Sequence, residues 1–249
     1  MSNILALFIC INILAMSNAS AYEYSVTVVD DYENDWLPYF DDLTPHGQEE
    51  YERVEYWLHD VAGWSEEFYN KDAAVVKSDF GTSNSGYKGL DEADFHFHFG
   101  HGIDDIGTEL ALHDWLPGVN YYDVRAQDVA DKWDQDNEWV FLHSCHILAD
   151  EDDWADALRY SHGIMGFTTG TRVSTSLINR FFTNTINNDC KMTTSFYKAT
   201  KDTYGADVTA AIITDNIDQW NTDHLNGQGP MAASEYPDDS EYCYLSWEC

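Results

Sequence analysis

Basic residues are scarce in this sequence. Its 249 residues hold 12 Lys and Arg against 45 Asp and Glu, which gives a net charge of −33. The acids are spread along the chain, so its surface repels nucleic acid and anionic membranes. We therefore expect no nucleic-acid partner. The charge suits cationic partners or a high-salt environment, in which ions screen the self-repulsion.

Long apolar runs are absent after residue 21. Before that point the segment from Ile4 to Leu14 is apolar, and Ala19-Ser20-Ala21 fits a signal-peptidase site. We predict that residues 1–21 are a secretory signal and that the mature protein is secreted or displayed at the cell surface. No later segment approaches the roughly 20 apolar residues of a spanning helix, so we expect no stable membrane span after cleavage. Because no basic residue precedes the apolar run, a retained anchor stays an open alternative.

Cysteine and linker residues are also few. Four cysteines follow the signal, at Cys145, Cys190, Cys243 and Cys249, which is too sparse for a disulfide-built scaffold. The short spacing makes Cys243 and Cys249 the expected pair if a disulfide forms. No linker or repeat divides residues 22–249, so a single domain is expected.

Apolar and amphipathic segments alternate along the mature chain. Five β-branched or apolar segments predict strands, at residues 24–30, 93–99, 138–144, 163–169 and 208–214. Helical spacing or caps predict helices after Pro45 and within residues 123–133, 152–160, 177–186 and 193–203. The tail from Asn221 is expected to be irregular. This alternation predicts an α/β sandwich with a mostly parallel sheet and helices on both faces.

Two of the predicted strands end in residues that can perform chemistry. One runs "FHFHF" into Gly100-His101-Gly102, and the other runs "WVFLH" into Ser144-Cys145. Because ligands collect beyond the carboxyl ends of parallel strands, we expect His101 and Cys145 to lie at one edge of the sheet. A neighbouring imidazole activates a thiol as a nucleophile, and the N–H groups of Gly102 and Cys145 are candidates for an oxyanion hole.

This pattern resembles the caspase-like cysteine peptidases of clan CD, which include caspases, legumains, gingipains and clostripain. The longer runs "WVFLHSCHIL", "HGIMGFTTGT" and "DHLNGQGP" are similar to an uncharacterised prokaryotic family of that architecture, over roughly residues 90–230. The resemblance implies a caspase-like three-layer sandwich and a peptidase that acts on peptide or protein substrates. Together with the predicted signal it makes an exported cysteine peptidase, for which we expect no cofactor. It also implies that Cys145 is the nucleophile and that His101 is the general base.

The same resemblance implies that the segment after Cys145 shapes the substrate pocket. The pocket residues we expect are Asp104, His143, Gly166 and Thr168. His143 departs from the family pattern, because these peptidases often carry Asp or Gln at that place.

Other interpretations remain open. Seven of the ten histidines lie between His96 and His162, and His96 and His98 share one face of a strand. With His101 they form a candidate zinc site, which would make the protein a zinc-dependent hydrolase. Alternatively, their imidazoles pack on one face of the sheet and are satisfied by hydrogen bonds. The acidic run Asp150-Glu151-Asp152-Asp153 is either a helix start or a Ca²⁺ site. A buried, inactive Cys145 would instead indicate a non-catalytic binding protein at the cell surface.

Overall fold

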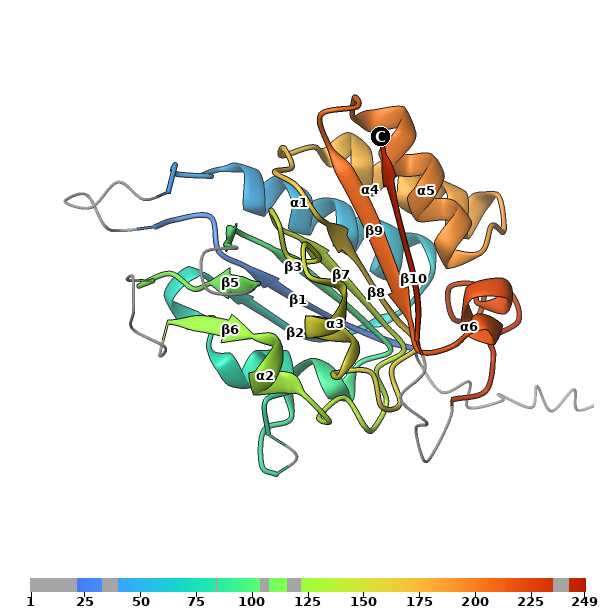
Figure 1. Ribbon diagram of the computed structural model, residues 1–249, viewed down its shortest axis with the longest axis horizontal. Coiled ribbons are helices and arrows are strands. Elements are labelled where there is room, and N and C mark those ends of the chain that lie inside the picture. Colours follow the sequence, from blue (N-terminus) through green and yellow to red (C-terminus); the bar gives the residue numbers. More distant parts are fainter. Residues whose placement is uncertain (1–21, 33–39, 84, 104–107, 116–121, 235–241) are drawn as a thin grey trace, which may run out of the picture.

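A seven-stranded sheet forms the centre of the protein (Figure 1). The computed structural model describes residues 22–32, 40–83, 85–103, 108–115, 122–234 and 242–249. The strand order is β10-β9-β8-β7-β3-β1-β2. The strands are β1 (Glu23–Val28), β2 (Ser65–Lys71), β3 (Phe95–Phe99), β7 (Trp139–His143), β8 (Gly163–Phe167), β9 (Thr209–Thr214) and β10 (Cys243–Glu248). Neighbours from β2 to β8 are parallel, and β9 and β10 add an antiparallel end.

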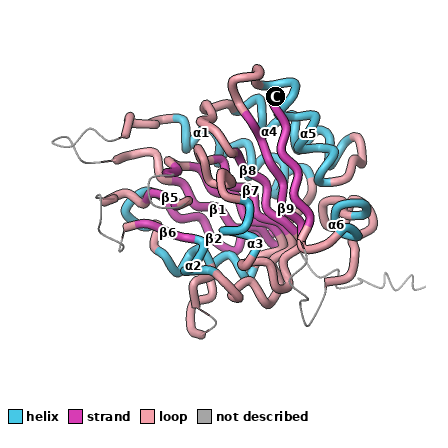
Figure 2. The backbone as a smooth tube through the Cα atoms, in the orientation of Figure 1, coloured by secondary structure: helices cyan, strands magenta, loops and turns pink. Residues whose placement is uncertain are grey.

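Helices cover both faces of this sheet (Figure 2). One face carries α1 (His46–Glu55), α4 (Thr175–Phe182) and α5 (Met192–Thr203); α1 and α4 continue as π-helical turns at Tyr56–Val61 and Thr183–Asn187. The other face carries shorter elements, namely α2 (Ala126–Val129), α3 (Glu151–Ala155), 3₁₀ turns at Asp72–Ala74, Lys77–Phe80 and Gly89–Glu92, and a small sheet of β4 (Gly102–Ile103), β5 (Glu109–Ala111) and β6 (Asp123–Arg125). The last helix, α6 (Ile217–Thr222), lies where the parallel strands begin.

Phe and His side chains alternate along β3, so this strand contributes to the packed layers on both faces of the sheet. Phe95, Phe97 and Phe99 pack into the core beneath α1 and α4, whereas His96 and His98 face the opposite layer. Both imidazoles are fully buried and bonded to hydroxyls of β1, with His96 Nδ1 2.8 Å from Ser25 Oγ and His98 Nδ1 2.9 Å from Thr27 Oγ1. Burial lowers the pKa of His98 to about 3 and that of His96 well below its usual value, so both rings are neutral packing groups.

The expected α/β architecture, with a mostly parallel sheet and helices on both faces, is confirmed. The helix expected within residues 123–133 is present but covers only Ala126–Val129, and the helix expected at residues 152–160 covers Glu151–Ala155. Two expectations are wrong. Residues 208–214 are not the final strand, because β10 follows within the tail that we expected to be irregular. Cys243 and Cys249 stand at opposite ends of β10, about 20 Å apart at a rise of about 3.3 Å per residue, so they do not pair.

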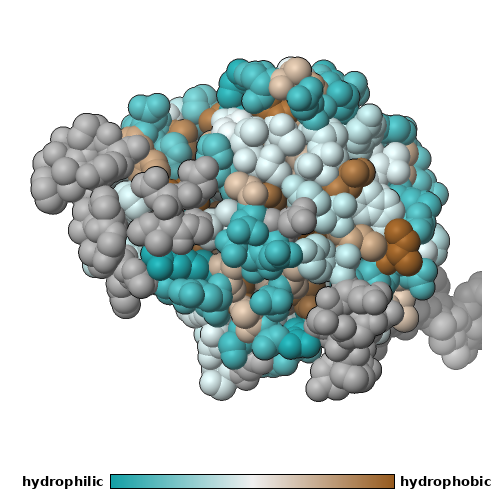
Figure 3. Space-filling view, in the orientation of Figure 1, coloured by the Kyte–Doolittle hydropathy of each residue, from teal (hydrophilic) through white to brown (hydrophobic). Residues whose placement is uncertain are grey.

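The surface is predominantly polar on the face drawn in Figure 3, where apolar residues form small separate groups. No helix in the described ranges is long and apolar enough to cross a membrane. The predicted signal at residues 1–21 lies outside the described residues.

Candidate active site

The carboxyl ends of β3 and β7 carry the two residues on which the sequence prediction depends. The strands are adjacent and parallel, with Phe99 opposite His143, and His101 and Cys145 each follow two residues after their strand. Both line one small pocket of about 50 Å³. Gly102 makes this approach possible, because a Cβ at its position would lie 2.0 Å from the carbonyl oxygen of Cys145 and 3.2 Å from its nitrogen. Only a residue without a side chain allows the two backbones to touch.

Three groups hold the His101 imidazole. Its Nε2 lies 2.8 Å from the carbonyl oxygen of Asp41, its ring stacks on Phe40 at 4.6 Å between centroids, and its backbone N–H donates to the Tyr32 hydroxyl at 2.7 Å. A carbonyl only accepts, so Nε2 carries the proton. Burial lowers the pKa of His101, which keeps the ring neutral at pH 7. The lone pair is therefore on Nδ1, which makes no hydrogen bond within the described part of the chain and can accept a proton.

The thiol of Cys145 is held from the loop after β8. The Thr171 N–H donates to Sγ at 3.2 Å, and the thiol lies 3.7 Å from the Thr171 carbonyl oxygen. Burial raises the pKa of Cys145, and the Thr171 N–H acts in the opposite direction. Among the described residues, no hydrogen bond joins this thiol to the imidazole of His101. The resting pair is therefore a neutral thiol beside a neutral imidazole.

The chain turns sharply after the thiol. His146 has φ of +58°, a left-handed conformation that is uncommon for a residue with a side chain. Its N–H donates to the Thr169 carbonyl at 3.0 Å, which ties the turn to the β8 loop. Local strain of this kind gathers at functional sites, where the surrounding structure maintains it.

A buried acid–imidazole pair supports the pocket. His143 Nδ1 lies 2.7 Å from Glu50 of α1, and both side chains are almost fully buried. The other Glu50 oxygen accepts the Ser174 N–H at 3.1 Å, while His143 Nε2 lies 3.1 Å from the Tyr204 hydroxyl. Glu50 therefore connects β7, α1 and the start of α4, and it fixes the orientation of the His143 ring.

Of the four expected pocket residues, the structure brings one to the pocket. His143 lines it. Gly166 packs instead against Ile147 and Leu148, and Thr168 is not among the lining residues. Asp104 lies outside the described residues. The segment Thr171–Val173 and Leu43 complete the wall.

Three residues around the site, Phe40, Asp41 and Glu50, were not predicted from the sequence. A signal for Glu50 was present, because it lies four residues before Val54 and so shares the buried stripe of the helix after Pro45. An acid at such a position needs a buried partner, here His143. No comparable signal marks Asp41, which contacts His101 through its backbone carbonyl.

The described part of the chain offers no ligand set for the zinc or calcium sites considered from the sequence. Within the described ranges, no group of three or more His, Cys, Asp or Glu is placed to hold an ion. His96 and His98 instead bond to the Ser25 and Thr27 hydroxyls of β1. In the acidic run, Asp150 caps α3 by accepting the Asp152 N–H, and Asp153 accepts the Thr108 hydroxyl at 2.9 Å. Asp150 therefore serves the start of the helix, and Asp153 holds the segment at Thr108.

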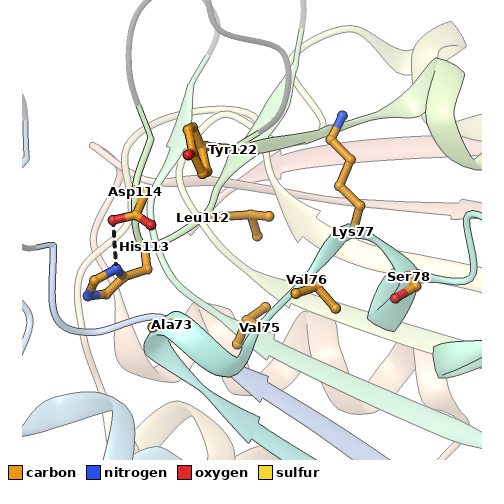
Figure 4. A pocket seen from close by; sticks show the side chains of 9 residues that line it. All are labelled: Ala73, Val75, Val76, Lys77, Ser78, Leu112, His113, Asp114 and Tyr122. Atoms are coloured by element: carbon orange, nitrogen blue, oxygen red, sulfur yellow. Dashed lines mark hydrogen bonds and ion pairs between the residues drawn. The ribbon is translucent and has the colours of Figure 1, made fainter.

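A larger cavity of about 480 Å³ lies apart from these residues (Figure 4). Its walls come from residues 73–78, residues 112–114 and Tyr122, and none of them lines the smaller pocket. Val75, Val76 and Leu112 give it an apolar floor, and His113 bonds to Asp114 at 3.1 Å. It contains no predicted site residue.

Comparisons with known proteins identify a family for the chain but no activity. No curated protein matches it. Among solved structures, the crystal structure of the Drosophila initiator caspase Dronc is similar, with a TM-score of 0.46 and 10% identity over 84% of this chain and 81% of that one. A likeness this distant says nothing about activity. The family described as "Domain of unknown function (DUF6345)" matches residues 39–247, most of the sequence, and the chain belongs to that family.

Proposed function

We propose that this protein is an exported cysteine hydrolase that cleaves peptide bonds with a Cys145–His101 dyad, as the caspase-like peptidases do. The observation that carries the proposal is the joint position of the two side chains. They line one pocket at the carboxyl edge of a parallel sheet, and the backbones that follow their strands are in contact at Gly102. This edge is where such sheets place their chemistry.

The chemistry follows from the protonation states. Sγ–H of Cys145 transfers its proton to the vacant Nδ1 of His101 as sulfur attacks the scissile carbonyl carbon, and the Asp41 carbonyl stabilises the imidazolium that forms. The N–H groups of Gly102 and Cys145 are the candidate donors to the carbonyl oxygen. His101 then protonates the leaving amine, and water releases the acid from the thioester.

The proposed substrate is a peptide with a small residue before the scissile bond. The pocket of about 50 Å³ beside Sγ accommodates only a short side chain. Glu50, the buried acid bonded to the pocket residue His143, also accepts the Ser174 N–H, which leaves it unavailable to a basic side chain. Peptidase activity of purified protein on libraries that vary this residue tests the assignment.

The test of the nucleophile is covalent labelling. A peptidyl acyloxymethyl ketone with alanine next to the warhead should add one probe to the full chain, and peptide mapping should locate it on Cys145. Cys145→Ala should abolish labelling with an unchanged melting curve, and His101→Gln should slow labelling at least about 100-fold because the base is lost. Cys190→Ala, at a partly exposed thiol outside the pocket, is the matched control. Equal labelling of Cys145→Ala would refute the role.

Export is tested separately. Expression in a secreting host should release a chain that begins at Tyr22, as N-terminal sequencing would establish. A chain retained in the membrane with residues 1–21 intact would favour the anchor instead.

A second candidate is a non-catalytic binding protein of the same fold. It is favoured by the thiol's resting contacts, which go to Thr171 rather than to His101, and by the small volume of the pocket. Under this alternative Cys145 reacts no faster with the ketone probe than Cys190 does.

A further inference from the structure

A second constellation of reactive side chains lies at the opposite edge of the sheet. His162 immediately precedes β8, at the amino end of the strand, whereas Cys145 follows the carboxyl end of β7. A five-residue strand at about 3.3 Å per residue separates these edges by on the order of 15 Å. Asp223 follows α6, which Figure 1 shows at this amino edge.

Three side chains are connected here in series. His162 Nε2 lies 2.9 Å from the Ser234 hydroxyl, and His162 Nδ1 lies 2.7 Å from Asp223 Oδ2. A carboxylate only accepts, so Nδ1 donates to Asp223 and Nε2 holds the lone pair that accepts the serine proton. Hydroxyl, imidazole and carboxylate in this order, with opposite ring nitrogens used, is the arrangement that activates a serine.

The surroundings fix the orienting carboxylate. Asp223 is 1% exposed, and beyond His162 it accepts the indole N–H of Trp139 at 3.0 Å and the backbone N–H of Ala232 at 2.7 Å. The backbone of His162 is held on both sides, because its N–H donates to Glu138 at 2.7 Å and its carbonyl accepts the Asp215 N–H at 3.0 Å. Asp223 and His162 therefore cannot turn away from one another.

The serine is the accessible member of the series. His162 is 2% exposed, whereas Ser234 is partly exposed and stands in a non-helical segment beside Ala232 and Ala233, whose side chains are small. Ser234 is therefore the member of the series with exposed surface, whereas the imidazole and carboxylate behind it are covered. A purely structural serine–histidine bond does not need a buried carboxylate with two further donors behind it.

We propose that Ser234, His162 and Asp223 form a second, serine-based hydrolytic site that acts on carboxylic esters. Ser234 Oγ bonds to the ester carbon as its proton passes to His162 Nε2; the carbon–oxygen bond to the alcohol breaks, and the same proton goes to the departing alkoxide. Water then attacks the acyl-serine by the same proton path, which releases the acid and restores the hydroxyl. The net charge of −33 favours neutral or cationic esters over anionic ones.

The experiment uses the full chain carrying Cys145→Ala, so that the thiol site cannot contribute. A neutral alkyl fluorophosphonate should add one phosphonyl group, and peptide mapping should place it on Ser234. Hydrolysis of p-nitrophenyl acetate should stop in the labelled protein. Adding Ser234→Ala should remove both reactions, and His162→Gln should lower both at least about 100-fold.

Ser83→Ala, at a partly exposed serine whose hydroxyl donates to the Ser85 carbonyl, is the matched control and should leave both reactions unchanged. Folding is followed by circular dichroism, and Ser234→Ala should leave the spectrum unchanged because it removes a single hydroxyl at a partly exposed residue. Absence of phosphonylation in the Cys145→Ala protein, or a label on another residue, overturns the proposal. Failure of the ketone probe at Cys145 does not affect it, because the two reagents address different edges of the sheet.

Discussion

The protonation state of Cys145 is open to a direct measurement. Burial raises the pKa of the thiol from its usual value of 9.0 and lowers that of the imidazole from 6.5, so the resting pair carries no charge. A thiol of pKa 9.0 is about 1% thiolate at pH 7, and a buried one is less ionised. Alkylation of Cys145 by iodoacetamide should therefore rise about tenfold per pH unit between pH 6 and 8, because only the thiolate reacts.

The assay is peptide-resolved mass spectrometry of alkylation against time at each pH. Cys190 in the same sample corrects for changes in the reagent. A rate that is independent of pH between 5.5 and 7.5 would mean a resting thiolate–imidazolium ion pair, and it would refute the argument from burial. His101→Gln should leave the slope unchanged, since the imidazole is neutral before the substrate arrives.

Three further changes test the framework. Gly102→Ala places a methyl group 2.0 Å from the Cys145 carbonyl oxygen, so the free energy of unfolding in urea should fall by about 1–3 kcal/mol and probe labelling should be lost. Gly205→Ala is the control and should be near neutral, because its nearest contact is at 3.3 Å. Glu50→Ala leaves the buried His143 Nδ1–H and the partly buried Ser174 N–H unpaired and should cost about 2–4 kcal/mol, and a loss as large in Glu50→Gln would contradict this account. Burial is the main reason that the pKa of Glu138 is raised to about 9, so the folded state keeps a proton that the unfolded state loses above pH 4.5. The free energy of unfolding should therefore fall by up to about 1.4 kcal/mol per pH unit between pH 4.5 and 9. Glu138→Gln should flatten that fall in denaturation curves measured across this pH range.

Strand ends were readable from the sequence because they depend on local patterns. β3 and β7 are buried on both faces: β3 alternates Phe with His, β7 is almost continuously apolar, and a glycine or polar residue follows each strand. The prediction that His101 and Cys145 lie at the same edge of the sheet then followed from the parallel arrangement of the two strands. The fold class and the approach of these two loops were therefore accessible before any coordinates.

Other elements gave no such signal. β2 reads "SEEFYNK" and is an edge strand with no fully buried residue, so its apolar content is too low to mark it. The strands of the small sheet have two or three residues, which is too short for any periodicity. β10 follows an acidic stretch and pairs antiparallel to β9, a contact that depends on tertiary packing rather than local sequence.

The partners of the histidines were inaccessible for a different reason. His101 is oriented by a carbonyl 60 residues earlier, and His162 by a carboxylate 61 residues later. Neither separation follows a helical or strand period, so no pattern within one element reveals it. The residues that set each ring's chemistry come from loops that converge only after the sheet forms.

These two histidines also show how one side chain acquires two tautomers in a single fold. The Asp41 carbonyl accepts from Nε2 of His101, which leaves Nδ1 without a proton, whereas the Asp223 carboxylate accepts from Nδ1 of His162, which leaves Nε2 without a proton. The two unprotonated nitrogens belong to opposite edges of the sheet. Because one edge carries a thiol and the other a hydroxyl, a ketone and a fluorophosphonate used in turn distinguish a chain with two reactive edges from one that uses either edge alone.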